Sequence, residues 1–128
     1  MKYYIEKTIN DTFENVVEKV KAILPDFGFG VVSEFDIDEK LKNKLGVDFR
    51  PYKVIGACNP KYAYEALLEE PLLGTMLPCN IIVQLIGVDT VQIAAVDPVA
   101  SMAAIENDKL KEAAEFIKGQ LAEIIEKV

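Results

Sequence analysis

The sequence contains no histidine and only two cysteines among its 128 residues. The lack of histidine excludes Ser-His-Asp and Cys-His catalysis, imidazole metal ligands and the usual proton shuttle near neutral pH. Two cysteines are too few for a disulfide scaffold, and in a reducing compartment both are expected as free thiols. Any site chemistry must therefore come from groups other than imidazole, namely thiols, carboxylates, lysine, arginine and neutral polar groups.

Positive charge is also in deficit, with 14 Lys and Arg against 21 Asp and Glu and a net charge of −7. Nucleic acid is an unfavoured partner, because binding its backbone needs clustered positive charge. No apolar run reaches the length of about 20 residues that spans a bilayer, and the start of the chain lacks the pattern of a secretory signal. We expect a cytoplasmic protein with no membrane partner.

What the sequence does contain is enough apolar material for one core. Hydrophobic residues make up 51% and charged residues 27% of the chain. A chain of this length buries about two-thirds of its surface on folding. We find no repeat, low-complexity tract or linker, so residues 1–128 are expected to form a single globular domain.

The first half predicts two strands and two helices. Residues 2–9 alternate as a strand, and the segment 11–14 (Asp-Thr-Phe-Glu) is typical of a capping box that opens a helix ending near Pro25. A second strand over 29–35 is expected to be covered on the side of Phe29, Val31, Ser33 and Phe35. Asp38 is a candidate cap for a short helix that ends at Gly46.

The second half predicts a central strand over 52–58, followed by a helix that Asn59-Pro60 opens and Pro71 ends. Residues 72–77 are expected as a loop or irregular turn. The runs 81–86 and 91–96 predict an antiparallel hairpin, Asp97-Pro98 a short helical turn, and Asn107 the cap of a long final helix. This order indicates an α+β fold with helices packed on an antiparallel sheet, and no phosphate-binding glycine motif supports a Rossmann fold.

Four segments resemble a small bacterial and archaeal family known as domain of unknown function 302: LGVDFRPY at 45–52, IGACNP at 55–60, LPCN at 77–80 and AVDP at 95–98. The resemblance covers nearly the whole chain in the expected order. It implies a compact antiparallel sheet with helices, a two-layer architecture similar to TATA-binding-protein-like domains. It implies no activity, cofactor or catalytic residue, and a shared fold does not indicate DNA binding.

The same segments suggest a candidate site. Cys58 ends one strand, Cys79 begins a later one and Asp97 follows the hairpin, so their strand ends meet if the middle strand is antiparallel to both others. Together with Asn59 and Asn80 they form our candidate ligand site. A thiol just before a helix N-terminus favours the thiolate, and the amides there could bind an anion.

Each of these residues also has a purely structural interpretation. Asn59 and Asp97 are sufficient as helix caps, and both cysteines could be small core residues. A metal at Cys58 and Cys79 would need further ligands from Asp97, the backbone, an exogenous group or a second subunit. Arg50 is either a clamp for a carboxylate or phosphate, or one half of a surface ion pair with Asp48 or a nearby glutamate.

Three functions remain open. The first is a domain that binds a small ligand or metal near Cys58, Cys79 and Asp97. The alternatives are a homodimeric interaction module, which uses an exposed sheet face or helix stripe, and a thiol-dependent enzyme with Cys58 as nucleophile. The sequence identifies neither the ligand nor a cofactor.

Overall fold

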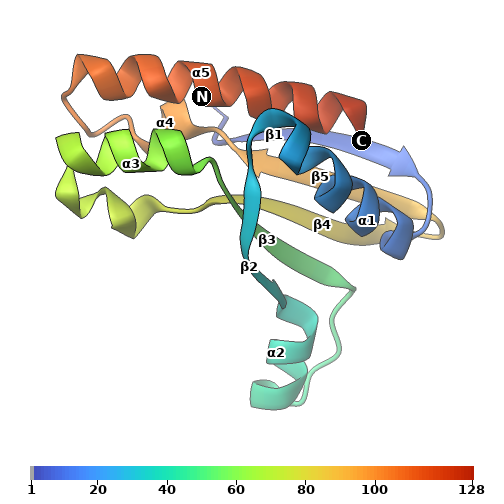
Figure 1. The fold of residues 1–128 in the computed structure, drawn as a ribbon. Coiled ribbons are helices and arrows are strands. Elements are labelled where there is room, and N and C mark those ends of the chain that lie inside the picture. The colour runs from blue at the N-terminus through green and yellow to red at the C-terminus, as the bar shows by residue number, and fades with distance from the viewer. Residues whose placement is uncertain (1) are drawn as a thin grey trace.

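The computed structural model describes residues 2–128 as a five-stranded sheet with helices packed against it (Figure 1). Every neighbouring pair of strands is antiparallel, and the spatial order is β1-β5-β4-β3-β2. The strands are β1 (Tyr4–Asn10), β2 (Gly30–Asp36), β3 (Tyr52–Cys58), β4 (Cys79–Gly87) and β5 (Thr90–Val96). The predicted α+β class and the predicted hairpin are both confirmed.

The helices lie between and after the strands, and α1 and α5 pack on the same face of the sheet. They are α1 (Phe13–Ile23), α2 (Ile37–Leu45), α3 (Pro60–Glu69), α4 (Pro98–Ser101) and α5 (Asp108–Lys127), with short 3-10 helices η1 (Leu24–Phe27) and η2 (Pro71–Met76). The segment 72–77 that we expected as a loop is therefore largely helical. Within residues 2–128, none of the helices combines the length and apolar character needed to cross a membrane.

The core lies on one face of the sheet only. Alternate residues of β4 and β5, such as Ile81 and Ile93, are fully buried against α1 and α5. Side chains on a strand alternate between the two faces, so Ile82 and Ala94 point to the opposite face, where they stay partly exposed. The sheet therefore has one face in the core and one face that α1 and α5 do not cover.

Side-chain caps fix the ends of the main helices. The Thr12 hydroxyl accepts a hydrogen bond from the Asn15 amide at 3.2 Å, so the cap of α1 lies one residue after the start of the predicted box. The Asn107 side chain accepts from the amides of Lys109 and Leu110, which confirms the predicted start of α5. Each cap satisfies amides that the first helical turn leaves unpaired.

The second strand differs from the expectation. Phe29, which precedes β2, is buried, but Val31 and Phe35 are 40% and 39% exposed. The reason is that β2 is the edge strand next to β3, away from the β1 edge where α5 packs. The alternation of apolar residues predicted the strand correctly, but it did not predict which of the strand's side chains are buried.

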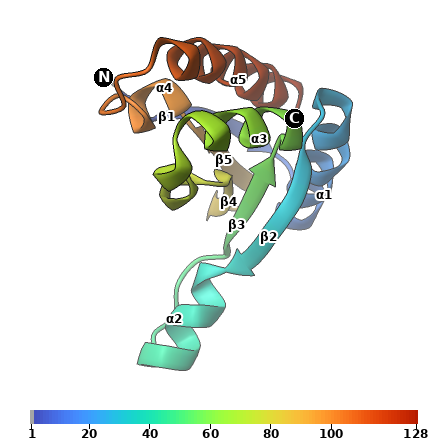
Figure 2. The same ribbon diagram turned by 60° about the vertical axis from the view of Figure 1, so that its left-hand side comes forward.

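Helix α2 also differs in its start and surroundings. It begins at Ile37, and Asp38 lies in its first turn, where its Oδ1 accepts a hydrogen bond from the Tyr52 amide at 3.1 Å. Gly46 ends the helix at a φ of 68°, a conformation that glycine adopts at little cost, as predicted. None of the residues of α2 is buried. Figure 2 shows α2 standing away from the rest of the molecule, beyond the ends of β2 and β3.

Candidate functional site

The strand order brings the ends of β3, β4 and β5 together. Ala57 of β3 pairs with Cys79 of β4, and Ile81 of β4 pairs with Ala95 of β5. Because β4 is antiparallel to both neighbours, Cys58, Cys79 and Asp97 lie at the same end of the sheet. The three segments are thus brought to one region, although their side chains have different surroundings.

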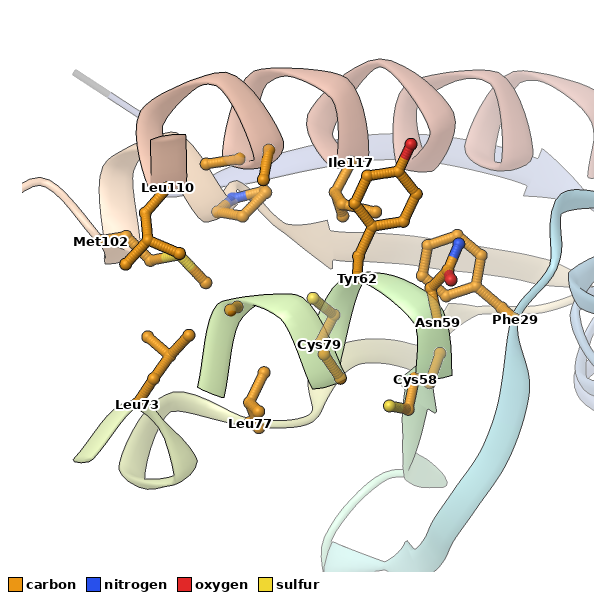
Figure 3. A pocket seen from close by; sticks show the side chains of 16 residues that line it. Phe29, Cys58, Asn59, Tyr62, Leu73, Leu77, Cys79, Met102, Leu110 and Ile117 are labelled. Carbon is orange, nitrogen blue, oxygen red and sulfur yellow. The ribbon is translucent and has the colours of Figure 1, made fainter. Parts of the chain in front are cut away.

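An apolar cavity of about 50 Å³ lies at this end of the sheet, between α3, η2 and α5. In Figure 3, Leu73, Leu77 and Met102 lie on one side of it and Phe29 on the other. Both cysteines and Asn59 line it. The remaining lining residues are Ala57, Tyr62, Ala63, Ala66, Pro98, Leu110, Ala113, Ala114 and Ile117.

Small side chains account for the cavity. Ala63 and Ala66 of α3 and Ala113 and Ala114 of α5 all line it. Protein interiors are otherwise packed as densely as organic crystals, because a void costs its lining atoms their dispersion contacts. Four alanines at one helix–helix contact leave unfilled space that larger apolar residues would close.

Two grooves continue the cavity along α5, one between α3 and α5 and the other between α5 and the segment from α4 to Ile105. A groove of about 300 Å³ shares Tyr62, Ala66 and Leu110 with the cavity. A second groove, of about 230 Å³, shares Met102, Leu110 and Ala114 with it. A small separation of α3 from α5 would join the cavity to the first groove, and their combined volume lies in the range of ligand pockets.

The two thiols are neighbours within the cavity wall. Burial raises the pKa of the Cys79 thiol to about 11, and the nearby Cys58 thiol contributes to the shift. Cys79 is therefore a neutral thiol at physiological pH, whereas a metal ligand or a nucleophile has to be a thiolate. Among residues 2–128, no group of three or more His, Cys, Asp or Glu side chains is placed to hold a metal ion.

This environment predicts slow alkylation of Cys79. Two pKa units lower the thiolate fraction about 100-fold, so iodoacetamide at pH 8 should modify native Cys79 about 100 times more slowly than the urea-unfolded chain. Peptide mass spectrometry over time would report each cysteine separately. Equal rates for Cys79 in the native and unfolded chains would contradict the neutral-thiol environment.

Asn59 lies at the cap position of α3, but its side chain makes no capping hydrogen bond, contrary to the expectation for this residue. Pro60 follows it at the first helical position, where a missing amide hydrogen is tolerated. The Asn59 amide instead lines the cavity together with the ring of Tyr62. That ring stacks on Phe116 of α5, with centroids 4.9 Å apart, and so connects α3 to α5.

Asp97 is not among the cavity residues, and both of its oxygens have partners. Oδ1 accepts from the amides of Val99 at 2.9 Å and Ala100 at 3.3 Å, while Oδ2 lies 2.9 Å from Lys118 Nζ of α5. Burial raises the pKa of this carboxyl, but the Lys118 and amide hydrogen bonds outweigh it and hold the pKa below its usual value. In this arrangement Asp97 caps α4 and connects it to α5.

Arg50 and Asn80 lie on the face of the sheet that α1 and α5 do not cover. Arg50 Nε donates to Gln84 Oε1 at 2.7 Å, and its guanidinium stacks on the Phe49 ring at 4.3 Å. The alternative interpretation of Arg50, an ion pair with Asp48 or a nearby glutamate, is not seen among residues 2–128, where Asp48 pairs with Lys42 at 2.9 Å. Asn80 lines a separate groove of about 480 Å³ on the same face.

The sequence analysis therefore identified the cysteine wall but missed the opposite wall of the cavity. The lining residues Tyr62 and Met102 and the alanines of α3 and α5 were not among the candidate site residues. The alanines were nevertheless visible in the sequence, as Ala63 and Ala66 on α3 and Ala113 and Ala114 on α5. Small side chains on two neighbouring helices either let the helices approach closely or leave a gap between them. Which of the two occurs depends on the distance between the helices.

Comparison with known proteins gives a family and a fold. The family model described as domain of unknown function DUF302 matches residues 5–128, which confirms the predicted family. A crystal structure of an uncharacterized conserved DUF302 protein from Bacillus stearothermophilus is similar, with 29% sequence identity and a TM-score of 0.91. The similarity covers 99% of this chain and 98% of that chain. No match was found among curated proteins.

Proposed function

The chain belongs to the DUF302 family, and within that fold we propose that it binds a small, uncharged, apolar molecule between α3 and α5. The observation that carries this proposal is the apolar cavity where the two cysteine segments meet the two alanine-rich helices. Its continuation into two surface grooves supplies a route for entry. The cavity alone has about a third of the roughly 150 Å³ that holds a benzene ring in a protein core, so it has room for a short alkyl segment and a longer ligand would extend into the grooves.

The chemistry of the lining selects the class of ligand. Of the described residues, no Asp, Glu, Lys or Arg side chain lines the cavity, and burial keeps the Cys79 thiol neutral. A charged ligand group would lose its hydration there without gaining a counter-charge. A ligand with an apolar body and one hydrogen-bonding group therefore fits better than an anion or a metal ion.

The alternatives have less support from the geometry. A metal at Cys58 and Cys79 would need two deprotonated thiols and further ligands, which the raised pKa of Cys79 opposes. An anion at the start of α4 would compete with Asp97, which already occupies the first amides of that helix. A small neutral ligand requires neither deprotonation of Cys79 nor displacement of Asp97 from the start of α4.

The first test uses 1-octanol as the probe. We expect octanol, added to uniformly ¹⁵N-labelled protein, to shift the amide resonances of residues around Cys79, Ala66 and Leu110 in a saturable way. Amides of the β4–β5 turn near Val88, far along the strands from the cavity, should not shift. Shifts that are absent, or that are spread over the surface without saturation, would contradict the proposal.

A cavity-filling variant makes the test specific. Ala66→Val adds two buried carbon atoms, each worth about 0.8 kcal/mol, against a helix-propensity cost of about 0.6 kcal/mol. It should stabilise the protein by about 1 kcal/mol in urea and abolish octanol binding. The matched control is Ala22→Val, at an exposed position of α1, which should leave octanol binding unchanged. Full octanol binding by a folded Ala66→Val variant would overturn the assignment of the site.

A further inference from the structure

A row of hydrogen-bonded polar side chains crosses the uncovered face of the sheet. Arg50, just before β3, donates to Gln84 of β4 at 2.7 Å, and Gln84 Nε2 donates to Gln92 Oε1 of β5 at 2.7 Å. Gln92 Nε2 in turn donates to the Glu6 carboxylate of β1. The row therefore has a basic end beside β3 and an acidic end on β1.

The surroundings of this row are suited to contact with another surface. The groove of about 480 Å³ over the row is lined entirely by strand residues and by Tyr3, which precedes β1. Ile82 and Ala94 at its centre are only partly buried, and Tyr3 is 72% exposed. An apolar centre with a polar border is the usual anatomy of a protein interface.

The projecting helix α2 is a second incomplete surface. It has nine residues, a length at which an isolated helix is marginal in water, and none of them is buried. The apolar side chains Leu45, Val47 and Phe49 at its end are 68%, 44% and 40% exposed. Natural helices are stabilised mainly by packing of their apolar side, and the apolar residues Ile37 and Leu41 of α2 are only partly buried.

We infer that the uncovered face of the sheet binds a second copy of this chain about a twofold axis parallel to the strands. Such an axis between β5 and β4 turns the sheet over and exchanges its two sides, so the β1 side of one copy faces the β3 side of the other. Glu6 of each copy then meets Arg50 of its partner. The basic end of the row in one copy thus lies opposite the acidic end of the row in the other copy.

The uncovered face of the sheet is too small by itself for a stable dimer interface, so we expect α2 to contribute to the contact. Four strands spaced at about 4.8 Å, with seven residues at about 3.3 Å each, present roughly 450 Å² in projection. A stable interface buries about 800 Å² on each partner. The exposed apolar residues of α2 and of the segment that leads to β3 extend the contact surface beyond the sheet, toward the area that a stable dimer needs.

Charge reversal tests this arrangement by sedimentation velocity. Within one chain Glu6 and Arg50 are three strand spacings apart, about 14 Å, and cannot touch. Glu6→Arg should place two arginines together at each of the two symmetric contacts, and Arg50→Glu two glutamates. Each variant alone should therefore dimerise at least about tenfold more weakly than the wild type.

The decisive sample is the equimolar mixture of the two variants. At both contacts an arginine of one variant meets a glutamate of the other, so a mixed dimer should form with wild-type affinity. The control is Val88→Lys, in the turn between β4 and β5, where Val88 is 94% exposed; it should not change the affinity.

A wild-type protein that stays monomeric at every accessible concentration would overturn the inference. So would single variants that dimerise normally, or a mixture that fails to recover. Octanol binding between α3 and α5 is a separate readout, so failure here leaves the proposed function untouched.

Discussion

Gly56→Ala is expected to destabilise the protein by about 3 kcal/mol or more, because the new methyl group has no room. A Cβ at Gly56 would lie 2.1 Å from Ser33 Oγ and 2.6 Å from Pro78 Cγ. The serine can rotate away, but the proline ring is part of the chain that leads into Cys79. Urea unfolding monitored by circular dichroism would measure the loss.

A glycine on the neighbouring strand provides the control. A Cβ at Gly30 meets no atom within 4 Å, so Gly30→Ala should be neutral or slightly stabilising through lower entropy of the unfolded chain. The comparison also concerns the cavity, because Pro78 can yield only by moving Cys79. We therefore expect folded Gly56→Ala protein to bind octanol more weakly than Gly30→Ala. Equal stability of the two variants would contradict the close packing of residues 77–79 on β3.

Asp97→Ala is expected to cost about 2–3 kcal/mol. The change removes the cap of α4 and two hydrogen bonds to a charged acceptor in a side chain that is only 6% exposed. It also removes the partner of Lys118, a smaller effect because that lysine is partly exposed. The free energy of unfolding in urea at pH 7 would measure the total.

Asp97→Asn separates charge from capping and gives a pH dependence. The amide oxygen can still accept from the amides of Val99 and Ala100, so this variant should lose less than Asp97→Ala. Because the folded-state pKa of Asp97 lies below its ordinary value of 3.8, the ionised carboxylate stabilises the fold above that value. The stabilisation is lost as pH falls through the folded-state pKa. Wild-type stability should therefore decline more steeply than that of Asp97→Asn as pH falls below about 4, and parallel curves would contradict the Asp97–Lys118 pairing.

Much of the fold could be predicted because its signals are local. Alternating apolar residues indicated the strands, and Asp97-Pro98 and Asn107 marked helix starts through hydrogen bonds that span only a few residues. The cover of β2 and the isolation of α2 could not be predicted in this way. Both depend on which strand lies at the edge of the sheet and which helices pack on it, and strand pairing between distant residues decides this.

The candidate site was also predicted only in part, because one part of it follows from strand order and the rest from packing. The meeting of Cys58, Cys79 and Asp97 followed from antiparallel order alone. The cavity did not, because it depends on the volume left between α3 and α5, whose alanines line the same space. The positions of Arg50 and Asn80 required the register of four strands, since a shift of one residue would move them to the other face.

The claim that the contact between α3 and α5 holds a ligand-accessible apolar cavity can be tested most directly with xenon. Xenon binds to dry apolar cavities and needs no specific hydrogen bonds. In crystals pressurised with xenon, we expect an ordered atom between Cys79, Ala66 and Ile117 in the wild type and none there in Ala66→Val. Crystals of the wild type with no xenon at this position, or with equal occupancy in the two proteins, would contradict the account.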